Sequence, residues 1–181
     1  MNKTIFLLLI AFAISKNLRE LKIENKLRGG LQRLYDRHNI LRQKHQVAPF
    51  VKDTDIEKRA QDFAETLAKK GVFERSDGKY NGEDIGENLY LMMSSGEPTF
   101  TGDDVVDKWL ESSNYDFNNP GFTEKDGHFT QIVWKSSTRI GCGAAKGPID
   151  CWNGLFVICN YYPAGNINNV AYFKENVLPP K

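Results

Sequence analysis

The sequence lacks the features that define several large classes of protein. Its 181 residues include only three histidines and three cysteines, and they contain no internal repeat or low-complexity run. No Gly-X-Ser-X-Gly motif occurs, which argues against a serine hydrolase with a nucleophile elbow. No apolar run beyond the N-terminus is long enough for a transmembrane helix. The length and a hydrophobic content of 40% instead suit one domain with one substantial core.

The N-terminus has the pattern of a secretory signal peptide. Lys3 gives a basic start, and Ile5–Ile14 is an apolar run too short to span a bilayer. Small residues in Ala13-Ile14-Ser15 stand three and one positions before a cleavage site. We therefore predict that residues 1–15 are removed and that the protein is secreted and extracellular. The alternative is an uncleaved anchor or a buried helix.

Charge is balanced overall but unevenly distributed. Removal of residues 1–15 would leave 23 basic and 23 acidic residues, and zero net charge argues against nucleic acid as the main partner. Residues 16–52 hold ten basic and three acidic residues, a net charge of +7, so the remainder carries −7. This basic region would suit an anionic membrane surface or a homodimer, although a solvated charged face is the simpler interpretation.

Three cysteines in an oxidising compartment predict one disulfide and one free thiol. Cys142 and Cys159 lie in two β-like runs, and they would face each other if those runs paired as a hairpin around residues 146–154. Cys151 lies on the loop itself. We predict the pair Cys142–Cys159, while the pair Cys151–Cys159 stays open. A free Cys151 would also allow a bridge between two chains.

Apolar spacing predicts three helices in the first two thirds of the chain. The segment 16–30 is interpreted as a charged, mobile arm or a frayed extension of the first helix. That helix is expected from residue 31 to Pro49, because apolar residues and histidines recur at three- and four-residue spacing: Leu31, Leu34, His38, Leu41 and His45. The second would begin at a capping box of Thr54 and Glu57 and end at Gly71. The third would run roughly over Asp103–Ser113.

The last third of the chain is β-like, and Phe129–Trp134 alternates enough to fit a strand. Helices before and after a few antiparallel strands indicate an α+β domain. The domain organisation predicted from the residues is therefore a signal peptide over 1–15, a charged arm over 16–30 and a single domain over 31–181.

Several sequence blocks together resemble one known family. The main blocks are GHFTQIVW at Gly127–Trp134, RIGCG at Arg139–Gly143 and FVICNYYPAGN at Phe156–Asn166. They are similar to the signatures of the CAP superfamily, which includes cysteine-rich secretory proteins, venom antigen 5 and plant pathogenesis-related proteins. Shorter words, such as Gly86–Leu89 and Asn114–Phe117, resemble the Golgi-associated plant-pathogenesis-related type. Those relatives are intracellular, whereas the signal peptide indicates secretion.

The resemblance sharpens the expected fold and agrees with the expected disulfide. It covers nearly the whole mature chain and implies a three-layer α-β-α sandwich with a central antiparallel sheet, a CAP or SCP domain. It also implies a short helix near residue 129. In relatives the middle cysteine usually pairs with one in the N-terminal half, and this chain has no cysteine there.

The resemblance also implies a cleft in which two histidines and two glutamates bind a divalent metal or act as acid and base. Three of the four carry over, as Glu87, Glu111 and His128; Glu111 is the softest match because its spacing after Trp109 is one residue short. Arg75 replaces the remaining histidine. Arginine offers only donors and cannot ligate a metal, so we expect it to pair with Glu87 or Glu111.

This degenerate set of ligands leads us to expect no required cofactor and weak or absent zinc binding. Glu87, Glu111 and His128 would still form an open three-ligand site, but a neighbouring cation makes metal binding costlier. Each residue also has a structural interpretation. His128 would be a hydrogen-bonded strut, Glu87 an acceptor of backbone N–H groups and Glu111 part of a solvated helix face.

A second candidate site is an aromatic loop. Tyr115, Phe117 and Phe122 lie beside the turn Asn118–Gly121, and such rings either pack inward or form a binding surface. In some relatives the corresponding loop binds sterols. The leading hypothesis is a secreted CAP protein that binds a sterol, another lipid or a protein partner. The alternatives are a metal-dependent hydrolase or protease that uses the cleft, and a self-associating module.

Overall fold

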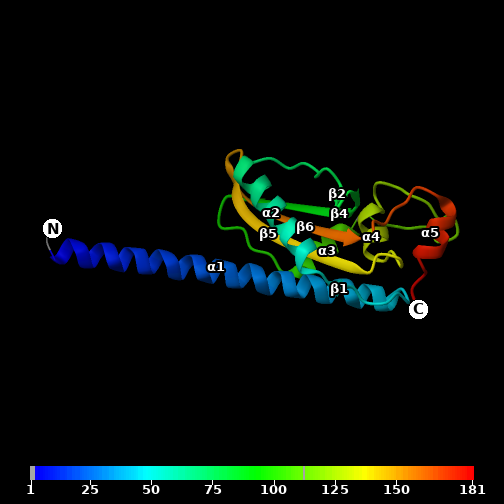
Figure 1. Ribbon diagram of the computed structural model, residues 1–181, viewed down its shortest axis with the longest axis horizontal. Helices are drawn as coiled ribbons and strands as arrows, with labels where there is room; N and C mark the ends of the chain where they lie inside the picture. Colours follow the sequence, from blue (N-terminus) through cyan, green and yellow to red (C-terminus); the bar gives the residue numbers. More distant parts are fainter. Residues whose placement is uncertain (1–2, 112) are drawn as a thin grey trace.

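The computed structural model describes residues 3–111 and 113–181, and it has three layers (Figure 1). A four-stranded sheet lies in the middle, with the strand order β1-β5-β6-β4. The second helix, α2, covers one face, and helices α1, α3 and α4 cover the other. The predicted α-β-α sandwich is therefore confirmed.

The sheet is built around a long hairpin. Strand β5 (Arg139–Ile149) pairs antiparallel with β6 (Trp152–Tyr162), and β4 (Gly86–Ser94) pairs antiparallel with the other edge of β6. The short edge strand β1 (Val51–Lys52) is parallel to β5, so the sheet is mixed rather than wholly antiparallel. A separate hairpin joins β2 (Lys79–Tyr80) to β3 (Glu83–Asp84).

Alternating side chains of β6 serve both cores. Leu155, Val157 and Cys159 point to the core under α1 and α3, whereas Phe156 and Ile158 point to the core under α2. Successive residues of a strand face opposite sides, so a strand buried on both faces reads as one continuous apolar run. This is why the part of the block FVICNYYPAGN that lies in the middle of β6, Phe156–Cys159, contains no polar residue.

Helix α1 runs without a break from Lys3 to Lys44. Its first part projects away from the sheet, and its last part packs across the domain (Figure 1). Within the segment 16–30 the side chains are exposed except at Ile23, Leu27 and Gly30, so this segment is a helical extension of the first helix. The helix continues through Gly29 and Gly30, and Gly30 packs against the ring of Phe100, where a Cβ atom would clash. No helix in the described residues is long and apolar enough to cross a membrane.

The predicted buried stripe of the first helix is confirmed in its main part. Leu34, His38, Leu41 and His45 are all buried, and Leu31 packs against the same core from a partly exposed position. The three- and four-residue spacing therefore identified the correct face of the helix.

Helix α2 (Thr54–Lys70) ends as predicted but begins differently. Its N-cap is Asp53, whose carboxylate accepts hydrogen bonds from the backbone N–H groups of Asp55 and Ile56 at 3.0 and 3.1 Å. The prediction of a Thr54–Glu57 capping box was therefore wrong by one residue, because the sequence offers two adjacent residues that can cap a helix. Gly71 terminates the helix in the left-handed conformation, with φ of 66°.

The remaining helices are short. Helix α3 (Gly102–Leu110) begins at a capping box of Thr101 and Asp104 and ends before the predicted Ser113. Helix α4 (Gly127–Ile132) shows that the ambiguous segment near residue 129 is helical. Helix α5 (Val170–Asn176) precedes the C-terminal coil.

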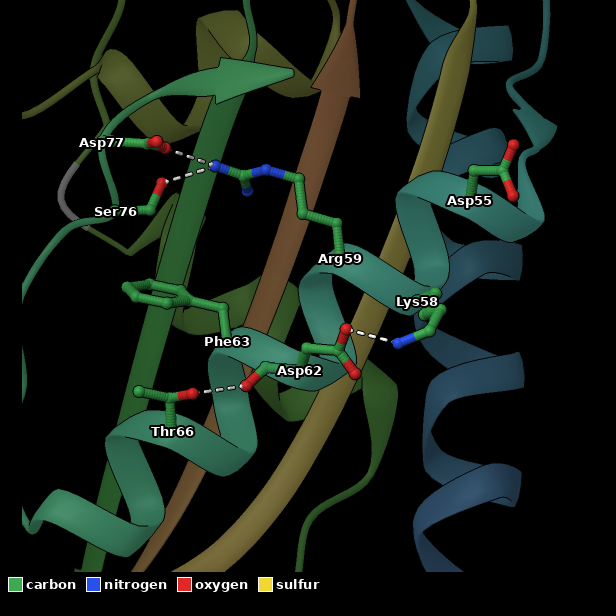
Figure 2. Close-up of a pocket in the computed structure, with 8 residues that line it drawn as sticks. All are labelled: Asp55, Lys58, Arg59, Asp62, Phe63, Thr66, Ser76 and Asp77. Atoms are coloured by element: carbon green, nitrogen blue, oxygen red, sulfur yellow. Dashed lines mark hydrogen bonds and ion pairs between the residues drawn. The ribbon is translucent and has the colours of Figure 1, made fainter. Parts of the chain in front are cut away.

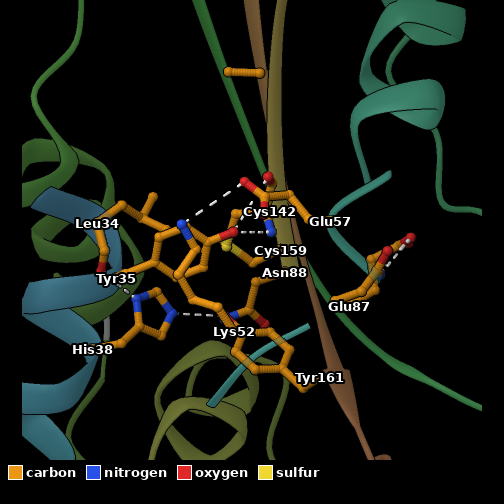
Figure 3. Close-up of a disulfide and its surroundings, with 12 residues drawn as sticks. Leu34, Tyr35, His38, Lys52, Glu57, Glu87, Asn88, Cys142, Cys159 and Tyr161 are labelled. Atoms are coloured by element: carbon orange, nitrogen blue, oxygen red, sulfur yellow. Dashed lines mark hydrogen bonds and ion pairs between the residues drawn. A yellow bond between two sulfur atoms is a disulfide. The ribbon is translucent and has the colours of Figure 1, made fainter. Parts of the chain in front are cut away.

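The predicted disulfide is confirmed. Cys142 and Cys159 are directly opposite each other in β5 and β6, and both are fully buried at the bridge (Figure 3). Cys151 is unpaired and exposed in the turn between the two strands. The close packing of this hairpin on α2 also depends on glycine, since a Cβ atom at Gly143 would lie 2.4 Å from the Cα atom of Gln61.

Beside the disulfide, His38 forms a buried polar link between α1 and the sheet (Figure 3). Its Nδ1 is 2.7 Å from the carbonyl oxygen of Leu34, to which it donates, and its Nε2 is 2.9 Å from the hydroxyl of Tyr161. Burial lowers the pKa of His38 to about 4, because a buried imidazolium loses its hydration. His38 is therefore neutral in the folded protein at neutral pH.

We expect His38 to make the fold acid-sensitive. The pKa of His38 in the folded chain, about 4, lies below the usual value of 6.5. Between these values the unfolded chain binds more protons, so stability is complete above pH 6.5 and falls as the pH drops toward 4, by roughly 3 kcal/mol. Urea unfolding at several pH values should show a flatter curve for His38→Gln over this range. Parallel curves for the two proteins would contradict the assignment.

Candidate functional site

A polar cleft opens where α4 meets the beginning of β4 and the coil after β6. Its volume is about 470 Å³. Its lining includes Arg75, Glu87, Phe122, Glu124, His128 and Asn166. Two of the three predicted metal ligands, Glu87 and His128, therefore share this cleft, together with Arg75 and with Phe122 from the predicted aromatic site.

The carboxylate of Glu87 is held within the protein. Its Oε1 accepts a hydrogen bond from the backbone N–H of Ser76 at 3.1 Å, and its Oε2 is 3.5 Å from Nδ2 of Asn160. The guanidinium of Arg59 lies 4.0 Å from the same carboxylate, and only 6% of the Glu87 side chain is exposed. Glu87 thus has one cation nearby, which it shares with Asp77, and each of its oxygens already faces a donor from the protein.

Arg59 is the residue that the sequence reasoning missed. It reaches from α2 toward the segment 76–79, as Figure 2 shows for Ser76 and Asp77. Its guanidinium donates to the oxygens of four residues, at 2.6 to 3.1 Å: Ser76, Asp77, Lys79 and Asn160. The sequence did indicate that Arg59 lies near the core. It is three residues after Ile56 and four before Phe63, on the flank of the buried stripe of α2.

Arg75 takes a different role from the one predicted. Its side chain is exposed, and Nη1 donates to the backbone carbonyl of Glu87 at 3.2 Å rather than to a carboxylate. Among the described residues no carboxylate lies within ion-pair distance of its guanidinium. The expectation that Arg75 would pair with Glu87 or Glu111 was therefore wrong, because Arg59 already occupies the position beside Glu87.

His128 lies on α4 and is partly buried. Its ring centroid is 5.9 Å from that of Trp109, and its backbone carbonyl accepts a hydrogen bond from Nδ2 of Asn88 at 3.2 Å. Burial lowers the pKa of His128, and the nearby charge of Arg75 lowers it further. The imidazole is therefore neutral at neutral pH.

Glu111 does not lie in the cleft. It follows the last turn of α3, where it is exposed and forms an ion pair with Lys108 in a separate surface hollow. The structure thus brings together Glu87 and His128 but not the third predicted ligand. Within the described residues, no group of three His, Cys, Asp or Glu side chains is placed to hold a metal ion.

The cleft residues do not fit a zinc site. A catalytic zinc needs three protein ligands. Here the carboxylate of Glu87 faces Arg59, Glu111 lies outside the cleft, and the guanidinium of Arg75 lines it. Weak or absent zinc binding remains our prediction, which a zinc titration would test.

The three aromatic residues of the predicted lipid site separate into two groups. Tyr115 and Phe117 pack inward against Phe129, with ring centroids 5.9 and 6.4 Å from it, and Phe117 also stacks on His45. Phe122 is instead 45% exposed and lines the cleft. The local-core interpretation therefore holds for Tyr115 and Phe117, and of the three rings only that of Phe122 lines the cleft.

The segment that carries Phe122 is held by hydrogen bonds to Asp126, one of which comes from the adjacent residue Thr123. The buried carboxylate of Asp126 accepts from the hydroxyl of Ser113 at 2.8 Å and from that of Thr123 at 2.6 Å. Phe122 also lies against Gly127, where a Cβ atom would come within 3.2 Å of the ring. The residue before His128 in the GHF motif is thus small because the ring occupies that space.

A second hollow follows the outer side of α2 (Figure 2). It has a volume of about 570 Å³, and the ring of Phe63 forms part of its wall. Lys58 and Asp62 in its wall form an ion pair at 2.5 Å, and Asp77 pairs with Arg59 at 3.1 Å. This groove contains none of the residues predicted for the site.

The chain is similar in sequence to one family of known proteins over most of its length. The family model described as "Cysteine-rich secretory protein family" (CAP) matches residues 35–161. The chain is 40% identical to human Golgi-associated plant pathogenesis-related protein 1 over 145 residues, which cover 80% of this chain and 89% of the relative. It is 35% identical to pathogenesis-related protein 1B of Nicotiana tabacum, over 73% of this chain and 74% of the relative.

Other relatives are longer or more distant. The chain is 34% identical to the secreted protein RBT4 of Candida albicans over 83% of its own length, but it spans only 41% of that protein. Among solved structures, BmVAL-1 is similar with a TM-score of 0.58 at 22% identity, over 86% of this chain and 84% of that one. NaASP2, whose structure was solved with Zn2+, is similar with a TM-score of 0.56 at 22% identity, over 84% and 86%. At this identity, the two structural similarities show a shared fold.

Proposed function

Because this chain belongs to the cysteine-rich secretory protein family, we propose that it is a secreted binding protein whose lipid ligand lies in the polar cleft against Phe122. The observation that carries the proposal is the exposed Phe122 ring, which a sterol or another lipid would cover. An exposed aromatic ring beside polar groups suits a ligand with one apolar and one polar end.

Two further observations support binding rather than hydrolysis. The side chain of Glu87 is only 6% exposed, which leaves little of its carboxylate within reach of a substrate in the cleft. Glu111 is outside the cleft altogether. Secretion is supported by the N-terminal signal pattern and by relatives that are named as secreted, such as RBT4.

We expect Phe122→Ala to weaken binding of labelled sterol or fatty acid by about tenfold, since the half-exposed ring would bury its remaining surface on the ligand. Phe73→Ala is the matched control, because Phe73 is 46% exposed and lies outside the cleft. It should bind like the unmodified protein. Absence of binding by the unmodified protein, or equal binding by all three, would overturn the proposed site.

A further inference from the structure

The cleft contains a cation whose charge the protein does not balance locally. Arg75 uses one of its N–H groups on the carbonyl of Glu87, and the described residues offer its guanidinium no carboxylate within ion-pair distance. Arg59, the other arginine near Glu87, is in contrast surrounded by oxygen acceptors. An exposed guanidinium with free donors is a ready partner for a planar anion.

The charges near Arg75 do not form an ion pair with it. Glu87 lies 4.0 Å from Arg59, which also pairs with Asp77 at 3.1 Å, and His128 is neutral at neutral pH. Glu124 is the remaining charged group among the lining residues, and it is exposed. A negative group beside Arg75 would thus meet a guanidinium without an ion-pair partner among the described residues, and it would be repelled by the exposed Glu124 and, more weakly, by the nearly buried Glu87.

The apolar counterpart is provided by Phe122, which lines the same cleft. The cleft therefore offers two chemically different surfaces within one volume of about 470 Å³: a guanidinium beside a neutral imidazole, and an exposed aromatic ring. A ligand that uses both must carry a charged head and an apolar body.

We propose that the cleft selects an amphipathic anion, whose carboxylate or phosphate monoester head pairs with Arg75 while its apolar part covers Phe122. The inference rests on the proposed lipid-binding function and adds the charge of the ligand to it. Arginine favours both head groups because its parallel N–H donors match two oxygens of either one. Replacement of the family histidine by Arg75 then changes a position for a metal ligand into a position for an anion.

The test compares three probes that share one tail: dodecanoate, dodecyl phosphate and dodecanol. Their binding to the full chain is measured by calorimetry at pH 7.5 and low salt, below the concentration at which they form micelles. We expect at least one anion to bind about tenfold more tightly than the alcohol, the size of a charge-assisted hydrogen bond to arginine. The better anion identifies the head group.

Variants assign that preference to a residue. Arg75→Gln should bind all three probes equally, and Arg75→Lys should keep part of the preference, since lysine retains the charge without the planar fork. Glu124→Gln should strengthen binding of the anions alone. Lys58→Gln, which changes an exposed cation in the α2 groove, is the control and should leave the preference unchanged.

The possible outcomes separate this inference from the proposed function. Equal binding of the anions and the alcohol by the unmodified protein would overturn the anion inference while lipid binding stands. An anion preference that survives in Arg75→Gln would also overturn it, because the head would then lie elsewhere. Absence of binding by all three probes would overturn both.

Discussion

Replacement of Arg42 by alanine is expected to lower the free energy of unfolding by about 3–5 kcal/mol. Arg42 is fully buried on α1, and its guanidinium lies 3.7 Å from the centre of the Phe50 ring. It donates at 2.6 to 3.0 Å to four backbone carbonyls: those of Ala48, Ile132, Trp134 and Ser137. Alanine would leave these buried acceptors without a donor.

The effect of Arg42 reaches the cleft, because three of its four acceptors follow or end α4. Burial lowers the pKa of Arg42 to about 10, so it remains charged at neutral pH and its hydrogen bonds are charge-assisted. Helix α4 carries His128, and Arg42 ties the end of that helix to α1. Loss of this tie is therefore expected to loosen the cleft as well as the fold.

Guanidinium chloride unfolding measures the change. Arg42→Lys should show a smaller loss, because an ammonium cannot reach four carbonyls at once, and it keeps the test informative if the alanine variant does not fold. Arg37→Ala is the control; Arg37 forms a partly exposed ion pair with Asp107 at 3.0 Å, and its loss should cost about 0.2–1 kcal/mol. Similar losses for Arg42 and Arg37 would contradict the structural role of Arg42.

Replacement of Arg59 by alanine should also destabilise the protein strongly, by about 3 kcal/mol or more, because it leaves a nearly buried carboxylate without its cation. The Glu87 side chain is only 6% exposed and that of Arg59 is 17% exposed. The substitution would also release the segment 76–79, which Arg59 holds through Ser76 and the carbonyl of Lys79.

A double-mutant cycle separates these two contributions. If the stranded charge of Glu87 accounts for much of the loss, Arg59→Ala with Glu87→Gln should be more stable than Arg59→Ala alone. Arg33→Ala is the matched surface control, since the pair Arg33–Asp103 is largely exposed and its loss should be hardly measurable. An Arg59→Ala variant that is no less stable than Arg33→Ala would show that Glu87 does not depend on Arg59.

The features that the sequence predicted correctly depend on short spacings. The buried face of α1 followed from residues three and four positions apart, and the left-handed end of α2 followed from Gly71. The disulfide also became predictable once two β-like runs were seen to flank a turn, because hairpin pairing puts Cys142 opposite Cys159. Spacing did not decide between two adjacent residues that can cap a helix. The structure shows that the N-cap of α2 is Asp53 and not Thr54.

Most of the incorrect site predictions concern contacts between distant segments. Nothing in the spacing around Glu87 indicates that Arg59 reaches it from α2. Glu111 is an exception, because it pairs with Lys108 on the surface of the same helix instead of reaching the cleft. Aromatic residues beside a turn gave no sign of which rings face the core, and the structure packs Phe117 against the core while it exposes Phe122.

Together these contacts explain how a family cleft can persist with different chemistry. Arg59 balances Glu87 inside the wall, while Arg75 remains available on the surface. Phe122 is held beside them by Asp126 and Gly127. With Arg75 at the position of the family histidine, we expect a ligand with a negative head and an apolar body.

The most direct test of this account is mapping of the binding site by NMR on the isotope-labelled full chain during titration with dodecanoate. We predict that the largest amide shifts fall around the cleft, at Gly127, His128 and Gly165, and that they shrink in Phe122→Ala. Shifts centred instead on the α2 groove, at Asp62 and Thr66, would contradict the account, because they would place the ligand in the hollow that lacks both Arg75 and Phe122.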